Sequence, residues 1–152
     1  MRKIVDDLTL YLRNQYFNID SNFTLTQQRS KDRWSWIREG SVTYTIHIGF
    51  VDLVGTRDYT ALTEIAFELT TVPDILPVDF RTKEIYSLVV NGQKSTPWLV
   101  GEYLMVPRIY LVEGVNNIGV HYKGELDNDG LGLCMYIDET EATDKYYTYS
   151  QF

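Results

Sequence analysis

Hydrophobic and polar residues alternate with a period of two in two neighbouring segments after Ser41. One face of the first segment carries Tyr44, Ile46, Ile48 and Phe50, and the other face carries Thr43, Thr45 and His47. The second segment places Ile65, Phe67 and Leu69 inward and Glu64, Ala66 and Glu68 outward. This alternation is typical of a half-buried strand. The polar turn at residues 54–58 therefore predicts that the two strands form an antiparallel hairpin.

Shorter extended runs follow to the end of the chain, and turn residues separate them at intervals of roughly 8–12 residues. We expect them at residues 78–80, 85–90, 99–100, 103–106, 109–111 and 118–122. Asn91-Gly92 is the strongest short hairpin signal among the turns. No long helical pattern stands between strands, so a parallel, doubly wound sheet is not expected. The sequence predicts a mainly β fold, an antiparallel β-sandwich.

The first 40 residues have a different period. Residues 4–12 repeat at helical spacing, which favours an amphipathic helix, although Leu8, Leu10 and Leu12 also alternate and leave a strand open. Residues 24–27 form a candidate capping box before a second helix that ends by Gly40. On that helix we expect Trp34 and Ile37 to lie on the buried side and Trp36 to point elsewhere.

These patterns divide the chain into an N-terminal helical segment, residues 1–40, and a β-sandwich, residues 41–152, within one structural unit. At 152 residues the chain is long enough to bury a core without metal or disulfide help. Twelve tyrosines raise the aromatic content to 14%, which also favours strands.

Charge and cysteine content exclude several functions. The net charge of −7 argues against a nucleic-acid partner, which requires a clustered basic surface. The single Cys134 allows no intrachain disulfide and supplies no cysteine cluster for zinc. No apolar run approaches the roughly 20 residues of a membrane span, and no signal-peptide core follows the first residues. The sequence therefore predicts a cytoplasmic protein.

Candidate catalytic and metal-binding motifs are incomplete. His47 and His121 lie in separate predicted strands, and surface or structural roles suit them better than a metal pair. Asp127-Asn128-Asp129-Gly130 resembles a calcium loop, but Tyr136 stands where the bidentate glutamate belongs, which favours a hairpin turn. Cys134 lies in an apolar predicted strand and has no basic residue beside it in the sequence, which indicates a role in core packing. No metal, cofactor or catalytic residue is expected in this chain.

Several segments, in order, resemble the N-terminal domain of the zinc aminopeptidases, the gluzincin metallopeptidases that include alanyl aminopeptidases and leukotriene hydrolases. The similar segments are Tyr44–Ile48, Ile65–Leu69, Val78–Phe80, Leu88–Gly92, Gly114–Tyr122, Asp129–Leu133 with Asp138, and Tyr147–Phe152. The capped segment from Leu25 to Ile37 is also similar to a leading helix in some members. The resemblance covers roughly residues 24–152.

The resemblance implies a saddle-shaped β domain that lies against a thermolysin-like catalytic domain. Gln151 matches the substrate-contacting glutamine of the family, and the glutamate that holds the substrate α-amine would follow Phe152. The family's zinc-binding helix also lies beyond this chain. The implied function is a non-catalytic domain that completes the substrate site of a zinc-dependent enzyme removing N-terminal residues from peptides.

The final aromatic segment suggests a chain truncated before its catalytic domain, and whether such a chain is an enzyme stays open. The candidate docking face toward a catalytic domain in cis, or another protein partner, consists of Tyr146, Tyr147, Tyr149 and Phe152. One alternative is a stand-alone, non-catalytic β-sandwich that acts in protein interaction or assembly. Another is carbohydrate binding through Trp34, Trp36 or Trp98, which has no supporting spacing.

Overall fold

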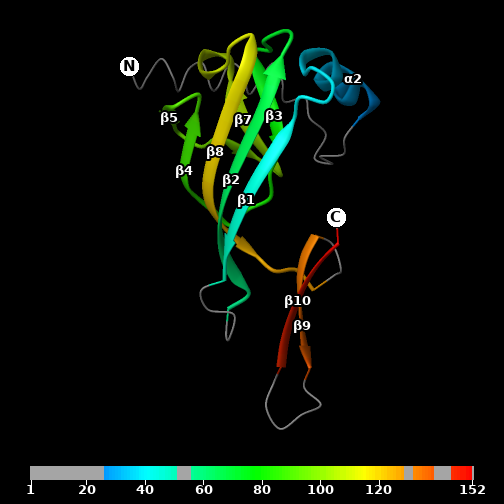
Figure 1. Ribbon diagram of the computed structural model, residues 1–152, viewed down its shortest axis with the longest axis vertical. Helices are drawn as coiled ribbons and strands as arrows, with labels where there is room; N and C mark the ends of the chain where they lie inside the picture. Colours follow the sequence, from blue (N-terminus) through cyan, green and yellow to red (C-terminus); the bar gives the residue numbers. More distant parts are fainter. Residues whose placement is uncertain (1–25, 51–55, 129–131, 139–144, 152) are drawn as a thin grey trace. The chain divides into compact units, whose positions relative to one another are not determined.

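The structure is a computed structural model that describes residues 26–50, 56–128, 132–138 and 145–151 (Figure 1). The chain divides into two units, Met1–Lys31 and Asp32–Phe152, and the second contains every described strand. The predicted helix at residues 4–12 and the predicted cap at Thr24 lie outside the described residues. The predicted domain boundary at residue 40 stays a prediction.

The described residues form three antiparallel sheets, which confirms the predicted mainly β, sandwich-like fold. The largest sheet has the order β1-β2-β8-β4-β5, and β1, β2, β8 and β4 run side by side in Figure 1. Its strands are β1 (Thr43–Gly49), β2 (Asp58–Leu69), β4 (Glu84–Val90), β5 (Gln93–Ser95) and β8 (Gly114–Glu125). The second sheet has the order β3-β7-β6, from β3 (Ile75–Asp79), β6 (Leu99–Val100) and β7 (Tyr103–Pro107). The third is a hairpin of β9 (Gly132–Asp138) and β10 (Lys145–Gln151).

The predicted hairpin of β1 and β2 is present, and its register confirms the alternation found in the sequence. Thr43 pairs with Ala66, and Gly49 pairs with Thr60. Ile65, Phe67 and Leu69 are buried, whereas Glu64 is exposed and Ala66 and Glu68 are partly exposed. Because side chains alternate across a strand, one face of β2 enters the core along its whole length.

The hydrophobic core lies between the five-stranded and the three-stranded sheets. Residues of β2, β4 and β8 supply one side of it, and Leu104 and Val106 of β7, both fully buried, supply part of the other. Ile118, Val120 and Tyr122 alternate along β8 and are buried in the same cluster. The apolar faces that alternation produces on the two sheets therefore pack together as a two-layer core.

The turn between β4 and β5 is formed by Asn91-Gly92, as predicted. Both residues have positive φ, 50° for Asn91 and 77° for Gly92, which is the left-handed geometry of a tight hairpin turn. Residues other than glycine, asparagine and aspartate are strained at positive φ.

A buried asparagine joins this turn to the start of β8. The Asn116 side chain is fully buried; its amide donates to the carbonyls of Val112 (2.7 Å) and Gly114 (2.9 Å). Its carbonyl accepts from the Val112 N–H (3.0 Å) and from the Asn91 side-chain amide (2.9 Å). The turn asparagine also accepts from the Asn117 N–H at 2.8 Å. Each hydrogen-bonding group of the Asn116 side chain thus has a partner, which is the condition for burying an amide without a large penalty.

Helix α2 (Gln27–Trp36) ends before Gly40, as predicted, but the prediction for its tryptophans is wrong. Trp36 and Ile37 pack against the core, whereas Trp34 is 73% exposed. The chain leaves the helix by pairing with the end of β2: the Thr70 N–H donates to Trp36 O, and the Arg38 N–H donates to Glu68 O. Ile37 forms a bridge with Leu69. Pairing with the end of β2 therefore sets the direction of the chain at Ile37, and helical spacing from Trp34 does not predict which face Ile37 and Trp36 occupy.

The predicted strand at residues 109–111 is also wrong. Arg108–Tyr110 is a short 3-10 helix, η1, that follows Pro107 at the end of β7. The Arg108 N–H donates to Asp74 O (2.8 Å), and the Arg108 guanidinium donates to Val72 O (2.6 Å). These contacts join η1 to the loop at residues 72–74, and η1 pairs with no described strand. Ile109 is 82% exposed. A run of three apolar residues is too short for alternation to identify a strand.

Candidate functional site

The terminal hairpin is the candidate site with the most exposed aromatic side chains. β9 and β10 pair without irregularity from Lys145 opposite Asp138 to Gln151 opposite Gly132. Gln151, the residue that the sequence analysis assigned to substrate contact, thus has its backbone at the last described position of β10, paired with the first residue of β9. Phe152 lies outside the described residues.

The register separates the tyrosines that the sequence analysis grouped as a docking face. Tyr147 lies opposite Tyr136, and Tyr149 lies opposite Cys134, two positions further along the same face. Tyr136, Tyr147 and Tyr149 are 58%, 50% and 47% exposed. The sequence analysis missed Tyr136; its alternation with Cys134 in a predicted strand was the available signal. These three side chains are named the tyrosine face below.

Tyr146 belongs to the opposite face of the hairpin. It lies across from Ile137, beside buried Met135, and is only partly exposed. These three residues border a hollow of about 520 Å³ that also includes Asp58 and Lys83. Tyr146 therefore faces charged groups of the five-stranded sheet, and Tyr147 and Tyr149 do not share its surroundings.

The backbone of Asp127 joins the hairpin to the end of β8. The Asp127 N–H donates to Leu133 O, and the Met135 N–H donates to Asp127 O, both at 3.0 Å. The Arg81 guanidinium donates to the Asp127 carboxylate at 3.0 and 3.4 Å. Asp127 thus lies in the connection between β8 and β9. These two strands do not pair with each other, and the bridge between Asp127 and Cys134 is parallel, so the predicted hairpin turn at residues 127–130 is wrong. Residues 129 and 130 lie outside the described residues.

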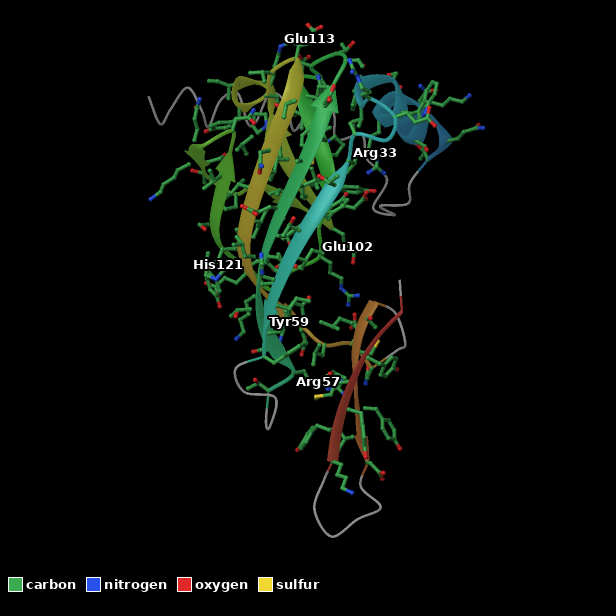
Figure 2. All side chains as sticks on the ribbon, viewed as in Figure 1. Arg33, Arg57, Tyr59, Glu102, Glu113 and His121 are labelled. Carbon is green, nitrogen blue, oxygen red and sulfur yellow. The ribbon has the colours of Figure 1, made fainter. Side chains whose placement is uncertain are left out.

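A second hollow, of about 420 Å³, lies between β1, the end of β8 and the start of β9. Its apolar lining includes Ile46, Ile48, Tyr59, Tyr122 and Leu133. Tyr59 is the second residue of β2, and Arg57 directly precedes the strand (Figure 2).

Tyr59 crosses directly over its register partner Gly124, whose added Cβ would meet the Tyr59 ring at 2.2 Å. Burial raises the pKa of the Tyr59 hydroxyl. Gly124 is therefore required for the aromatic floor of this hollow.

Several charged residues around the two hollows form ion pairs with one another. The Asp58 carboxylate accepts from Lys83 at 2.8 Å and also from Lys123, and Lys83 lies 3.0 Å from Glu125. The ammonium groups of Lys123 and then Lys83 lower the pKa of Asp58, and Asp58 in turn raises the pKa of both lysines. The charges of this cluster compensate one another, which suits a structural role better than general acid–base chemistry.

The two histidines share a face of the large sheet but do not meet. His47 of β1 and His121 of β8 are both register partners of Leu62 on β2, which lies between them. Two strand spacings separate their backbones by roughly 10 Å. The His121 ring makes an edge-to-face contact with Tyr86, with ring centroids 5.0 Å apart. Within the described part of the chain, no three histidine, cysteine, aspartate or glutamate side chains group as a metal site.

One apolar row that the sequence analysis placed on a single face of β1 is exposed in the structure. Tyr44, Ile46 and Ile48 of β1 lie opposite Ile65, Thr63 and Ala61 of β2, so they project on the core side of the sheet. They are nevertheless 61%, 52% and 39% exposed. These three residues are named the β1 row below.

Two comparisons with known proteins were without a match. No protein-family model matches the chain, and no curated protein sequence matches it. Among the described residues, no helix has the length and apolar character needed to span a membrane.

Proposed function

We propose that this chain is the non-catalytic N-terminal β domain of a zinc-dependent aminopeptidase, which docks against a metallopeptidase domain and completes its substrate site. The observation that carries the proposal is the terminal hairpin. It exposes three tyrosines on one face, and its last strand ends on Gln151, the residue that resembles the family's substrate-contacting glutamine.

Exposed tyrosines suit a docking role because they combine a large apolar surface with a polar hydroxyl group. Aromatic residues are enriched in the buried centre of protein interfaces, where a few of them carry most of the binding energy. Tyr136 and Tyr147 are directly opposite one another, and Tyr149 is two positions along β10. The tyrosine face is thus a contiguous surface on a regular ladder.

The contact between two asparagines also supports the proposal. Asn91 belongs to the segment that resembles the family's hairpin, and Asn116 belongs to the segment that resembles its later strand. The two side chains hydrogen-bond at 2.9 Å. Two segments that separately resemble the family are therefore joined by one hydrogen bond. This bond is a physical reason for an asparagine at each of the two positions.

In the proposed assembly the two domains divide the chemistry. Zinc, when bound by the metallopeptidase domain, polarises the scissile carbonyl and activates water. None of the described residues is assigned to the metal. This chain supplies a wall of the substrate site through Gln151 and a docking surface through the tyrosine face.

The coding sequence downstream of Phe152 tests the proposal directly. We expect a glutamate codon next, followed by a segment encoding the His-Glu-x-x-His zinc helix. A stop codon directly after Phe152 would overturn the proposal and favour the stand-alone interaction module.

A binding measurement tests the docking surface. The 152-residue chain is mixed with the separately expressed downstream zinc domain, and calorimetry gives the affinity. Replacing Tyr147 and Tyr149 by aspartate is expected to weaken binding by at least about tenfold, because charge would enter a desolvated contact. Val115→Asp, an exposed apolar position on β8, is the matched control. If the folded hairpin variant binds as tightly as the control, the tyrosine face is not the docking surface.

A further inference from the structure

The two edges of the five-stranded sheet differ in protection. β5 forms one edge with only three residues, Gln93–Ser95, including Lys94. β1 forms the other edge with seven residues, Thr43–Gly49, none of which is aspartate, glutamate, lysine, arginine or proline (Figure 1). Short length and lysine are devices that prevent edge-to-edge pairing. By these criteria the β5 edge is protected against pairing with another chain, and the β1 edge is unprotected.

We propose that β1 pairs with β1 of a second copy of this chain, so that two five-stranded sheets join in an antiparallel dimer about a two-fold axis at Ile46. This inference is independent of the proposed aminopeptidase function, because it rests on the sheet edge and not on the terminal hairpin. No described strand pairs with the outer side of β1.

The sequence of β1 is self-complementary in this register. Ile46 lies opposite its own copy, and Tyr44 lies opposite Ile48 of the second copy, which makes apolar pairs on one face. Thr45 lies opposite His47 on the other face. Aromatic and β-branched cross-strand pairs are favourable, and here no like charges face each other. The chain's net charge of −7 thus has no contribution from residues 43–49.

The match between apolar side chains favours this register over a neighbouring one. A shift by one residue would place Tyr44, Ile46 and Ile48 of one copy opposite threonine and histidine of the other. In the centred register the β1 rows of both copies form one apolar surface that is continuous with the core side of each sheet. The pairing uses the open edge of both copies, so assembly stops at the dimer.

The strength of the contact follows from its size. Only seven residues per copy pair, and the side chains of the β1 row are already about half covered. An interface below about 1,200 Å² is characteristic of weak, transient association. The dimer is therefore expected to depend on concentration and to dissociate on dilution.

Sedimentation velocity of the 152-residue chain over a range of concentrations tests the inference. The wild type is expected to shift from monomer to dimer, and Ile46→Lys is expected to weaken association by at least about tenfold. Val115→Lys, on an inner strand and 69% exposed, is expected to behave as the wild type. A wild type that stays monomeric, larger assemblies, or a dimer insensitive to Ile46→Lys would overturn the inference.

Disulfide trapping keeps the test decisive if Ile46→Lys fails to fold. Directly opposed antiparallel residues have Cα atoms about 4.5–5.5 Å apart, within disulfide range. Ile46→Cys is therefore expected to form a covalent dimer under mild oxidation, whereas Val115→Cys does not. The native Cys134 is buried, so the wild type measures the background level of crosslinking through this cysteine. Equal crosslinking of the two variants would contradict the proposed register.

Discussion

The core between the two larger sheets and the terminal hairpin are both antiparallel and rich in apolar residues, but the hairpin leaves a row of tyrosines about half exposed. Leu104 of β7 is fully buried against the large sheet, whereas Tyr147 of β10 is half exposed. The difference shows that strand pairing and burial are separate properties here. Pairing follows from alternation, and burial requires another element on the same face.

Truncation of a core residue should produce the largest effect on stability. Leu104→Ala is expected to lower the free energy of unfolding by about 3 kcal/mol, through lost burial and the cavity left behind. Tyr147→Ala removes a larger side chain but should cost only about 1 kcal/mol or less, because half of that side chain already meets solvent. Urea denaturation measures both. Similar losses for the two variants would show that the hairpin is as well covered as the core.

The buried asparagine should give the next largest effect. Asn116→Ala is expected to cost about 2 kcal/mol, because it leaves the Val112 N–H and the Asn91 amide without their acceptor near a buried site. Asn117→Ala, at an exposed neighbouring position, should stay within about 0.5 kcal/mol. Urea midpoints at one pH provide the measurement. Equal effects would mean that the amide network contributes nothing beyond the loss of an asparagine in β8.

The smallest effect concerns the ion cluster beside the hairpin. Asp58 has its pKa lowered by Lys123 and Lys83, from an ordinary value of 3.8. Its contribution to stability is therefore present above that value and is lost as the pH falls toward the lower folded-state value. The difference in urea midpoint between wild type and Asp58→Asn should be largest near neutral pH and shrink below about pH 4. Glu84→Gln, at an exposed position, is the control. A difference that does not change with pH would contradict a charge-dependent role for Asp58.

Local pattern predicted the elements whose surroundings are formed by near neighbours. Alternation in residues 60–69 identified the strand and its buried face, and Asn91-Gly92 identified the turn, since φ > 0 restricts which residues are comfortable there. The same reasoning was wrong for Trp34 and Trp36, because the end of α2 is positioned by hydrogen bonds to β2. It was also wrong for Arg108–Tyr110, where a contact with the residue 72–74 loop replaces a strand partner.

The candidate site was predictable only in part for a related reason. The aromatic content of residues 145–151 was visible in the sequence, and Tyr147 and Tyr149 do share a face. The distinct surroundings of Tyr146, and the inclusion of Tyr136, depend on which β9 residue stands opposite each β10 residue. The contact between Asn91 and Asn116 spans 25 positions, a separation at which no periodicity operates.

The sequence by itself determined the class of this fold, its main hairpins and the faces of its longest strands, because each follows from the two-residue repeat and the chemistry of turns. Only the tertiary structure decided which of those faces are covered. The row on β1 and the inward face of β2 have the same apolar character, yet β2 lies under the second layer and β1 lies at the edge. Exposure is a property of the neighbours that long-range packing brings to a strand, and the strand's own residues do not encode it.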